Sequence, residues 1–195
     1  TAPAPGLSVQ ALGNATYQGV YEEPVQLTDG TYTGEPFVEG SASRPTVVFA
    51  EQYVAYGDLN GDGAEDVAVL LAENSGGSGV FVYLAAVINQ DGTPVNVATQ
   101  FLGDRVDLKS VIIKDGEIVV NMITQGPDDP FCCPTMEVTQ SYRLEGDQLI
   151  EQTSFAGTYT AMMPAASSPG RDITLVLNPD GSTELSTDYL NFFCY

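Results

Sequence analysis

Short runs rich in Val, Ile, Thr, Tyr and Phe alternate with tight-turn signals along most of the chain. In one example, residues 110–113 and 118–123 flank Asp115-Gly116. Asp-Gly supplies the positive φ angles that a two-residue hairpin requires, so this stretch predicts a β-hairpin. By the same pattern, residues 79–89 pair with 94–102 around Asp91-Gly92, and residues 137–144 pair with 148–151.

Two further runs predict how deeply their strands are buried. Residues 66–72 are almost all apolar, which is typical of a strand buried on both faces. In residues 171–177, Ile173, Leu175 and Leu177 alternate with other side chains, which indicates a strand with one buried face. No stretch of ten residues carries a helical stripe. The pattern therefore predicts an all-β fold, a sandwich or an open barrel of antiparallel meanders.

A change of pattern near residues 152–155 predicts a boundary between two parts. We expect a flexible N-terminal segment over residues 1–15, a β domain over 16–152 and a small C-terminal β segment over 153–195. The first residues are small or Pro, with no initiator Met, and resemble the tether of an exported protein whose signal has been removed.

Charge excludes several function classes. The chain has 195 residues, with 26 Asp and Glu against 6 Lys and Arg, a net charge of -20. Nucleic acids and anionic membranes repel such a surface, and no apolar run is long enough for direct insertion in a membrane.

There is no His, which removes the commonest general base and most zinc sites. We therefore predict a protein that is not an enzyme.

The three cysteines are Cys132, Cys133 and Cys194. An odd count with an adjacent pair fits neither a disulfide framework nor a zinc ribbon. In an oxidising compartment, a bridge from Cys194 to one of the pair is the first alternative, and a bridge within the pair is the second.

The stretch from Asp58 to Asp66 reads Asp-Leu-Asn-Gly-Asp-Gly-Ala-Glu-Asp and predicts a calcium site. Calcium takes six to eight oxygen ligands, and in EF-hand loops positions 1, 3, 5, 7 and 9 face the ion, with Gly at position 6. Here Gly63 holds position 6. The predicted ligands are four side chains and one backbone carbonyl: Asp58, Asn60, Asp62, the carbonyl of Ala64, and Asp66.

This loop resembles the calcium loops of EF-hands, dockerins and the FG-GAP type of β-repeat. Val69 stands where an EF-hand has its bidentate Glu, and an apolar strand follows in place of a helix. The resemblance implies a structural clamp, completed by water or by a distant carboxylate such as Glu73 or Asp104. The alternative is a Gly- and Asp-rich turn without a metal.

The C-terminal stretch contains Gly157-Thr158-Tyr159, then residues 163–170, a strand and Asp180-Gly181. It resembles the start of the NlpE-type domain of bacterial envelope lipoproteins linked to copper resistance, a lipocalin-like β-barrel. Pro164, Pro169 and Gly170 fit that pattern, but Ala165 and Ser168 replace its two Cys residues. The copper role is therefore not implied here, because a soft copper site needs thiolates.

An NlpE-type barrel needs about twice this length, so the C-terminal β-unit is expected to be either cut short or completed by another chain. Unpaired strand edges invite strand addition between subunits, which builds filaments when it runs head to tail. The leading hypothesis is a non-enzymatic, extracytoplasmic bacterial protein, stabilised by calcium, that self-assembles at the cell surface. The alternative is an envelope lipoprotein that senses or binds a small ligand. The organism, ligand and partner stay open.

Overall fold

A computed structural model describes most of the chain, namely residues 5–37, 39–40, 42–130, 133–152, 157–165, 168–177 and 182–189. Strands make up 58% of the residues and helix 2%, so the all-β prediction is confirmed. Contacts divide the chain into two compact units, Thr1–Gln152 (unit 1) and Thr153–Tyr195 (unit 2).

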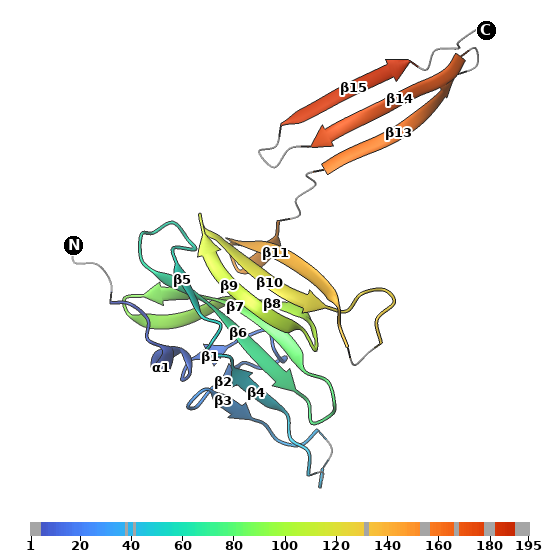
Figure 1. Ribbon diagram of the computed structural model, residues 1–195. Coiled ribbons are helices and arrows are strands. Elements are labelled where there is room, and N and C mark those ends of the chain that lie inside the picture. The colour runs from blue at the N-terminus through green and yellow to red at the C-terminus, as the bar shows by residue number, and fades with distance from the viewer. Residues whose placement is uncertain are drawn as a thin grey trace. The chain divides into compact units, whose positions relative to one another are not determined.

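Among the described residues of unit 1, one helical turn is followed by twelve strands (Figure 1). They are α1 (Val9–Leu12), β1 (Thr16–Tyr17), β2 (Val25–Gln26), β3 (Thr31–Thr33), β4 (Thr46–Phe49), β5 (Ala55–Gly57), β6 (Asp66–Asn74), β7 (Phe81–Gln90), β8 (Thr93–Asp104), β9 (Asp107–Lys114), β10 (Glu117–Thr124), β11 (Met136–Glu145) and β12 (Gln148–Glu151).

The strands of unit 1 form three antiparallel sheets. The largest runs β3-β4-β6-β7-β8 with β5 also paired to β6, the second runs β12-β11-β10-β9, and β1 pairs with β2. The three hairpins predicted from turns are confirmed as β7–β8, β9–β10 and β11–β12. Asp91 and Gly92 have φ angles of 53° and 87°, and Asp115 and Gly116 have 52° and 77°, as an Asp-Gly hairpin turn requires.

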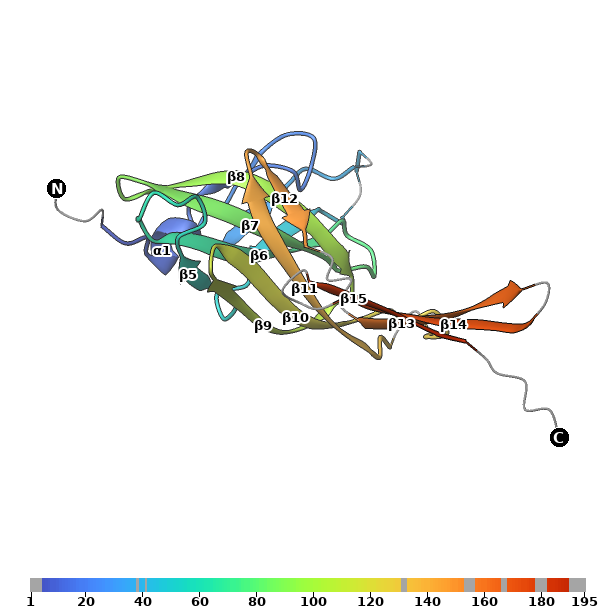
Figure 2. The same cartoon turned by 90° about the horizontal axis from the view of Figure 1, so that it is seen from above.

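One face of the large sheet packs against the four-stranded sheet, which is visible in Figure 2, where β9, β10 and β11 lie across β6 and β7. The shared core holds Leu70, Leu84, Ile118, Val120 and Tyr142, each at most 2% exposed. Near the margins β12 lies beside β8 and β5 lies beside β9. Each described sheet is open, so the sandwich alternative is the one found.

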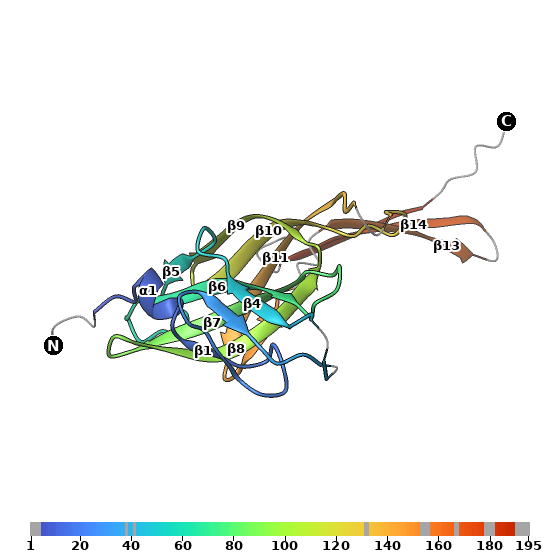
Figure 3. The same cartoon turned by 90° about the horizontal axis from the view of Figure 1, so that it is seen from below.

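The other face of the large sheet is covered by the N-terminal segment, seen from below in Figure 3, where α1 and β1 lie over it. Leu7, Leu12 and Tyr17 are buried there against Val69 and Leu71 of β6. The strand expected to be buried on both faces is therefore β6, with its first six residues all buried.

Within the segment expected to be flexible, residues 5–15 pack onto the large sheet. Leu7, Leu12 and Ala15 are 4%, 0% and 6% exposed. The Ser8 hydroxyl accepts a hydrogen bond from the Ala11 N–H and so caps α1. These residues pack because their apolar side chains complete the second core, which the small-residue and Pro-containing start of the chain did not indicate.

Unit 2 is a three-stranded antiparallel sheet in the order β13 (Gly157–Ala165), β14 (Ser168–Leu177) and β15 (Thr183–Tyr189). Pairing places Tyr159, Leu175 and Leu185 side by side, so they share one face. Thr160, Thr174 and Ser186 share the opposite, polar face. The predicted Asp180-Gly181 turn lies outside the described residues.

Candidate calcium loop and aromatic pocket

The predicted calcium loop leaves β5 and enters β6, and Gly57 of β5 pairs with Asp66 of β6 at its base. Gly61 and Gly63 have φ angles of 80° and 82°. A Cβ at either position would meet no other atom within 4 Å. Glycine is therefore favoured here by the left-handed backbone and not by crowding.

The polar side chains of the loop close it on itself. The Asp58 carboxylate accepts hydrogen bonds from the Gly61 N–H (2.7 Å) and the Gly63 N–H (3.0 Å). Asp62 accepts one from the Ala64 N–H (2.7 Å) and another from the Asn60 side-chain amide (2.8 Å). These donors lower the pKa of the Asp62 carboxyl, with the Ala64 N–H as the larger cause.

Asp66 has a different environment from the other acidic residues of the loop, because it is fully buried. One carboxylate oxygen accepts the Leu59 N–H (3.0 Å) and the other accepts the Asn89 N–H (2.9 Å). Asn89 belongs to β7, so this side chain fastens the start of the loop to the neighbouring strand. Buried polar groups require such partners.

The structure thus brings Asp58, Asn60 and Asp62 together around the loop backbone, but it turns Asp66 toward the interior. Within the described ranges, no three His, Cys, Asp or Glu side chains are grouped as metal ligands. Glu73 and Asp104 do not approach the loop. Glu73 and Asp104 both pair with Phe81, on neighbouring strands. Glu73 lies seven residues along β6 from Asp66, which corresponds to about 23 Å of extended strand.

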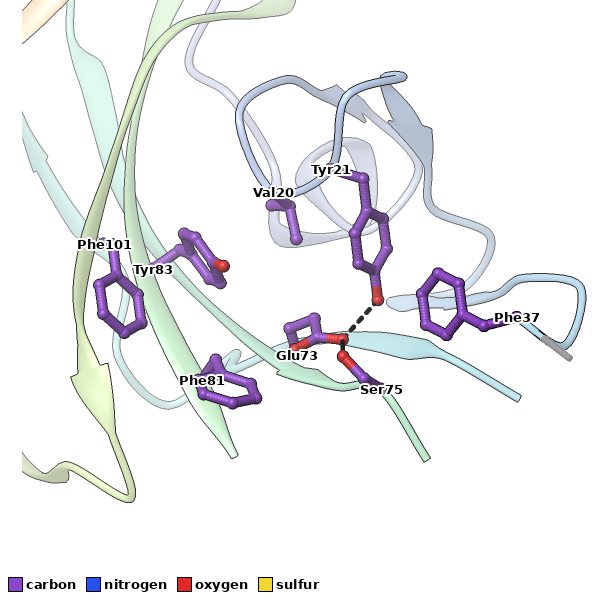
Figure 4. A pocket seen from close by; sticks show the side chains of 8 residues that line it. All are labelled: Val20, Tyr21, Phe37, Glu73, Ser75, Phe81, Tyr83 and Phe101. Atoms are coloured by element: carbon purple, nitrogen blue, oxygen red, sulfur yellow. Dashed lines mark hydrogen bonds between the residues drawn. The ribbon is translucent and has the colours of Figure 1, made fainter. Parts of the chain in front are cut away.

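The far end of the large sheet holds a pocket of about 440 Å³ that is mostly aromatic (Figure 4). Its walls come from the sheet and from the loops that follow β1, β3 and β6. The lining residues are Val20, Tyr21, Phe37, Glu73, Ser75, Phe81, Tyr83 and Phe101.

Strand register explains how the sheet side of this pocket forms. Glu73 is paired with Phe81, and Tyr83 is paired with Phe101. Because side chains alternate along β6, Glu73 lies on the same face as Val69 and Leu71. The carboxylate therefore continues the row of apolar side chains that the N-terminal segment covers.

Glu73 is only 2% exposed. Its Oε1 accepts hydrogen bonds from the Tyr21 hydroxyl and the Ser75 hydroxyl, both at 2.6 Å (Figure 4). Within the part of the chain that the structure describes, none of the ion pairs includes Glu73. Burial and the bond to Glu73 raise the pKa of Tyr21 far above its usual range, and burial and the same charge raise the pKa of Tyr83.

The aromatic rings form two groups on either side of Glu73 (Figure 4). Tyr21 and Phe37 meet edge to face with ring centroids 6.3 Å apart. On the other side, Phe101 lies 5.3 Å from Tyr83 and 6.3 Å from Phe81, centroid to centroid. Phe37 and Phe101 are 68% and 48% exposed. Two of the rings thus stay partly exposed near a buried carboxylate.

The sequence prediction missed this pocket because its residues lie far apart along the chain. One signal was present. Val67, Val69, Leu71 and Glu73 follow each other at strand spacing, so a charge occupies a position of the apolar face. From the sequence alone, Glu73 is considered only as a possible distant calcium ligand.

Asp129 and Cys133 lie outside both sites. Asp129 accepts hydrogen bonds from the Gly126 N–H, the Thr135 N–H and the Thr135 hydroxyl, which lower the pKa of its carboxyl. Cys133 is disulfide-bonded. Cys132 and Cys194 lie outside the described residues, so both bridging alternatives stay predictions.

A comparison of the chain with models of protein families, with curated proteins and with solved structures found no match. In the ranges that the structure describes, no helix combines the length and the apolar character needed to cross a membrane.

Proposed function

We propose that this chain is a non-enzymatic, extracytoplasmic β protein that acts by self-assembly, with unit 2 as the assembling surface. One observation carries the proposal. Unit 2 has one apolar sheet face, yet no apolar side chain of β13, β14 or β15 is buried among those described. Tyr159, Met163 and Leu185 of that face are 49%, 51% and 68% exposed.

Physical reasons favour a partner for this face. A sheet buries its apolar face against a second layer to become stable, and three strands alone provide little core. Among the described strands, β13 and β15 each pair only with β14, so each offers one edge for strand addition. We propose that the partner is a second copy of this chain, because two such sheets would cover each other's apolar faces.

The net charge of -20 opposes this association. An apolar contact between copies should therefore strengthen as salt screens the repulsion. A contact made by ion pairs should weaken under the same conditions. Salt dependence consequently separates the proposed contact from a charge-driven one.

The test measures the mass of the full chain in solution over a range of concentrations, in low and high salt, with electron microscopy for filaments. Leu185→Lys places a charge on the apolar face and should leave a monomer. Ser186→Lys, the matched control, places the same charge on the polar face of the same strand and should assemble as the wild type does. A wild type that stays monomeric throughout overturns the proposal, as does equal assembly of both variants.

We also propose that calcium stabilises unit 1 through the loop of Asp58, Asn60, Asp62, Ala64 and Asp66. The support is the loop sequence, the left-handed Gly61 and Gly63, and an acidic loop in which no Lys or Arg pairs with the described carboxylates. Binding requires Asp62 to release the Asn60 amide. Asp66 would act by holding the loop base, since its oxygens already accept two backbone N–H groups.

Calcium should raise the melting temperature, and EDTA should return it to the metal-free value. Asp62→Asn removes a charged ligand while its amide oxygen still accepts the Ala64 N–H, so it should abolish the calcium shift. Asp147→Asn, an exposed turn residue, is the control with the same charge change and should keep the shift. An unchanged melting temperature with calcium and with EDTA would refute the site.

The alternative function, a lipoprotein that binds a small ligand, has separate support in the aromatic pocket of unit 1. Its volume of about 440 Å³ lies within the usual range for ligand sites, roughly 300–1,000 Å³. Saturable binding of any small molecule that Phe101→Leu weakens would support this alternative.

A further inference from the structure

We infer that the aromatic pocket around Glu73 binds an organic cation, specifically a methylated ammonium group of the choline type. The inference deepens the ligand-binding alternative and does not depend on assembly through unit 2. It is carried by the combination of a buried carboxylate and aromatic faces on two sides of it (Figure 4).

The carboxylate selects the charge of the ligand. Glu73 is 2% exposed, and its Oε1 already receives the hydroxyl hydrogens of Tyr21 and Ser75. Within the described residues it has no cationic partner, so a ligand that brings positive charge compensates its desolvation. An anionic ligand is excluded by the same charge.

The walls select the chemical class of the cation. A metal ion needs several oxygen ligands, whereas Glu73 is the only carboxylate among the described residues that line this pocket. Ring faces attract cations that carry little hydration, and methylated ammonium groups are the usual ligands of aromatic cages. Phe37 and Phe101 are exposed and mark the entrance, while Tyr21 and Tyr83 are half-buried.

Hydrogen bonding favours a quaternary ammonium over a primary one. The two hydroxyl groups donate to the same carboxylate oxygen at 2.6 Å, so that oxygen is largely saturated. A primary ammonium has three N–H donors to satisfy, and Glu73 offers it at most its second oxygen. A methylated ammonium needs no acceptor and requires only charge and apolar contact.

The protein as a whole increases the local supply of such ligands. With a net charge of -20, it concentrates cations at its surface, most strongly at low salt. That attraction is unspecific, so the test must separate it from binding in the pocket.

The test is calorimetric titration of the full chain with tetramethylammonium and with choline, in low-salt buffer, beside the uncharged carbon analogue 3,3-dimethylbutanol. Both cations should bind saturably and the neutral analogue should not. Glu73→Gln keeps the size and an acceptor oxygen and should weaken binding by about tenfold or more. Glu22→Gln, which removes an exposed charge next to Tyr21, should leave binding unchanged.

Phe101→Leu is a second variant. Because Phe101 is 48% exposed, this variant should fold normally, and it should weaken the binding of both cations. Equal loss in Glu22→Gln and Glu73→Gln would show surface attraction only and overturn the inference. Binding of the neutral analogue as tight as that of choline would also overturn it, while leaving a small-molecule site in place.

The methylated ammonium of choline occurs free and as a lipid headgroup. Sedimentation with phosphatidylcholine vesicles, repeated with Glu73→Gln, distinguishes the two sources. If the wild type cosediments with the vesicles and Glu73→Gln does not, the ligand is the lipid headgroup. If choline binds in the calorimeter but the protein does not cosediment, the ligand is free choline. Absence of binding in both measurements overturns the inference.

Discussion

The two units of this chain both consist of antiparallel sheets but differ in what covers those sheets. In unit 1 the large sheet has a cover on each face, so β6 and β7 contribute fully buried side chains to two cores. In unit 2 none of the described apolar side chains is fully buried. The contrast shows that burial here follows the number of layers, and the fully apolar run of β6 and the alternating pattern of β14 reflect it.

The largest expected effect is in the first core. Leu70→Ala removes a side chain that is 0% exposed and should cost about 2–5 kcal/mol of the free energy of unfolding. Leu185→Ala, the same change at a side chain that is 68% exposed, should cost less than about 0.5 kcal/mol. Urea unfolding at a concentration at which the chain is monomeric measures both. A comparable loss in the two variants would mean that unit 2 has a cover within the monomer, and it would contradict the contrast.

The next effect concerns Asp66 and Asp62, the buried and an exposed carboxylate of the loop. Asp66→Ala leaves the buried N–H groups of Leu59 and Asn89 without an acceptor and should cost about 2–4 kcal/mol. Asp62→Ala, at an exposed position, should cost under about 0.5 kcal/mol without calcium. The measurement is chemical unfolding in EDTA. An equal cost would mean that the loop, and not the anchor to β7, holds this end of the sandwich.

A smaller effect should follow at the pocket. Tyr21→Phe removes one of the two hydroxyl donors to Glu73 and should cost about 1–2 kcal/mol, since bonds to charged groups exceed the average. Tyr32→Phe is the control, because its hydroxyl has no hydrogen bond among the described residues. Thermal unfolding compares them. A neutral Tyr21→Phe would indicate that Glu73 is satisfied without this donor.

The smallest effect is a change in how steeply the free energy of unfolding falls as the pH rises. Burial and, second, the charge of Glu151 raise the pKa of Tyr142 to about 12. A folded-state pKa above the unfolded value of about 10 contributes stability below pH 10, and this is lost as the pH rises toward 12. Unfolding free energy should therefore fall more steeply between about pH 10 and pH 12, the range between the two pKa values, in the wild type than in Tyr142→Phe. Parallel curves would contradict this.

Much of the sandwich was predictable because its determinants are local. The Asp-Gly turns at Asp91 and Asp115 set two hairpins through backbone angles that only neighbouring residues decide. The fully apolar run at residues 66–72 predicted a strand covered on both faces, and β6 is that strand.

The candidate sites were less predictable because they depend on residues that meet only after folding. Tyr21 and Glu73 are 52 positions apart, and their contact follows from the N-terminal segment crossing the large sheet. Asp66 was expected as a ligand, but the position of Asn89 on β7 decides that its carboxylate faces inward. Residues 5–15 were expected to be flexible because nothing local shows that Leu7 and Leu12 complete a core.

By itself, then, the sequence determined the longer strands from residue 66 onward, their hairpins and the all-β class, because turn chemistry and side-chain alternation act over a few residues. The tertiary structure alone decided which strand faces have a cover, which places a carboxylate among aromatic rings and leaves Leu185 exposed. Layer packing joins residues separated by long stretches of chain, and no pattern within one strand records its partner.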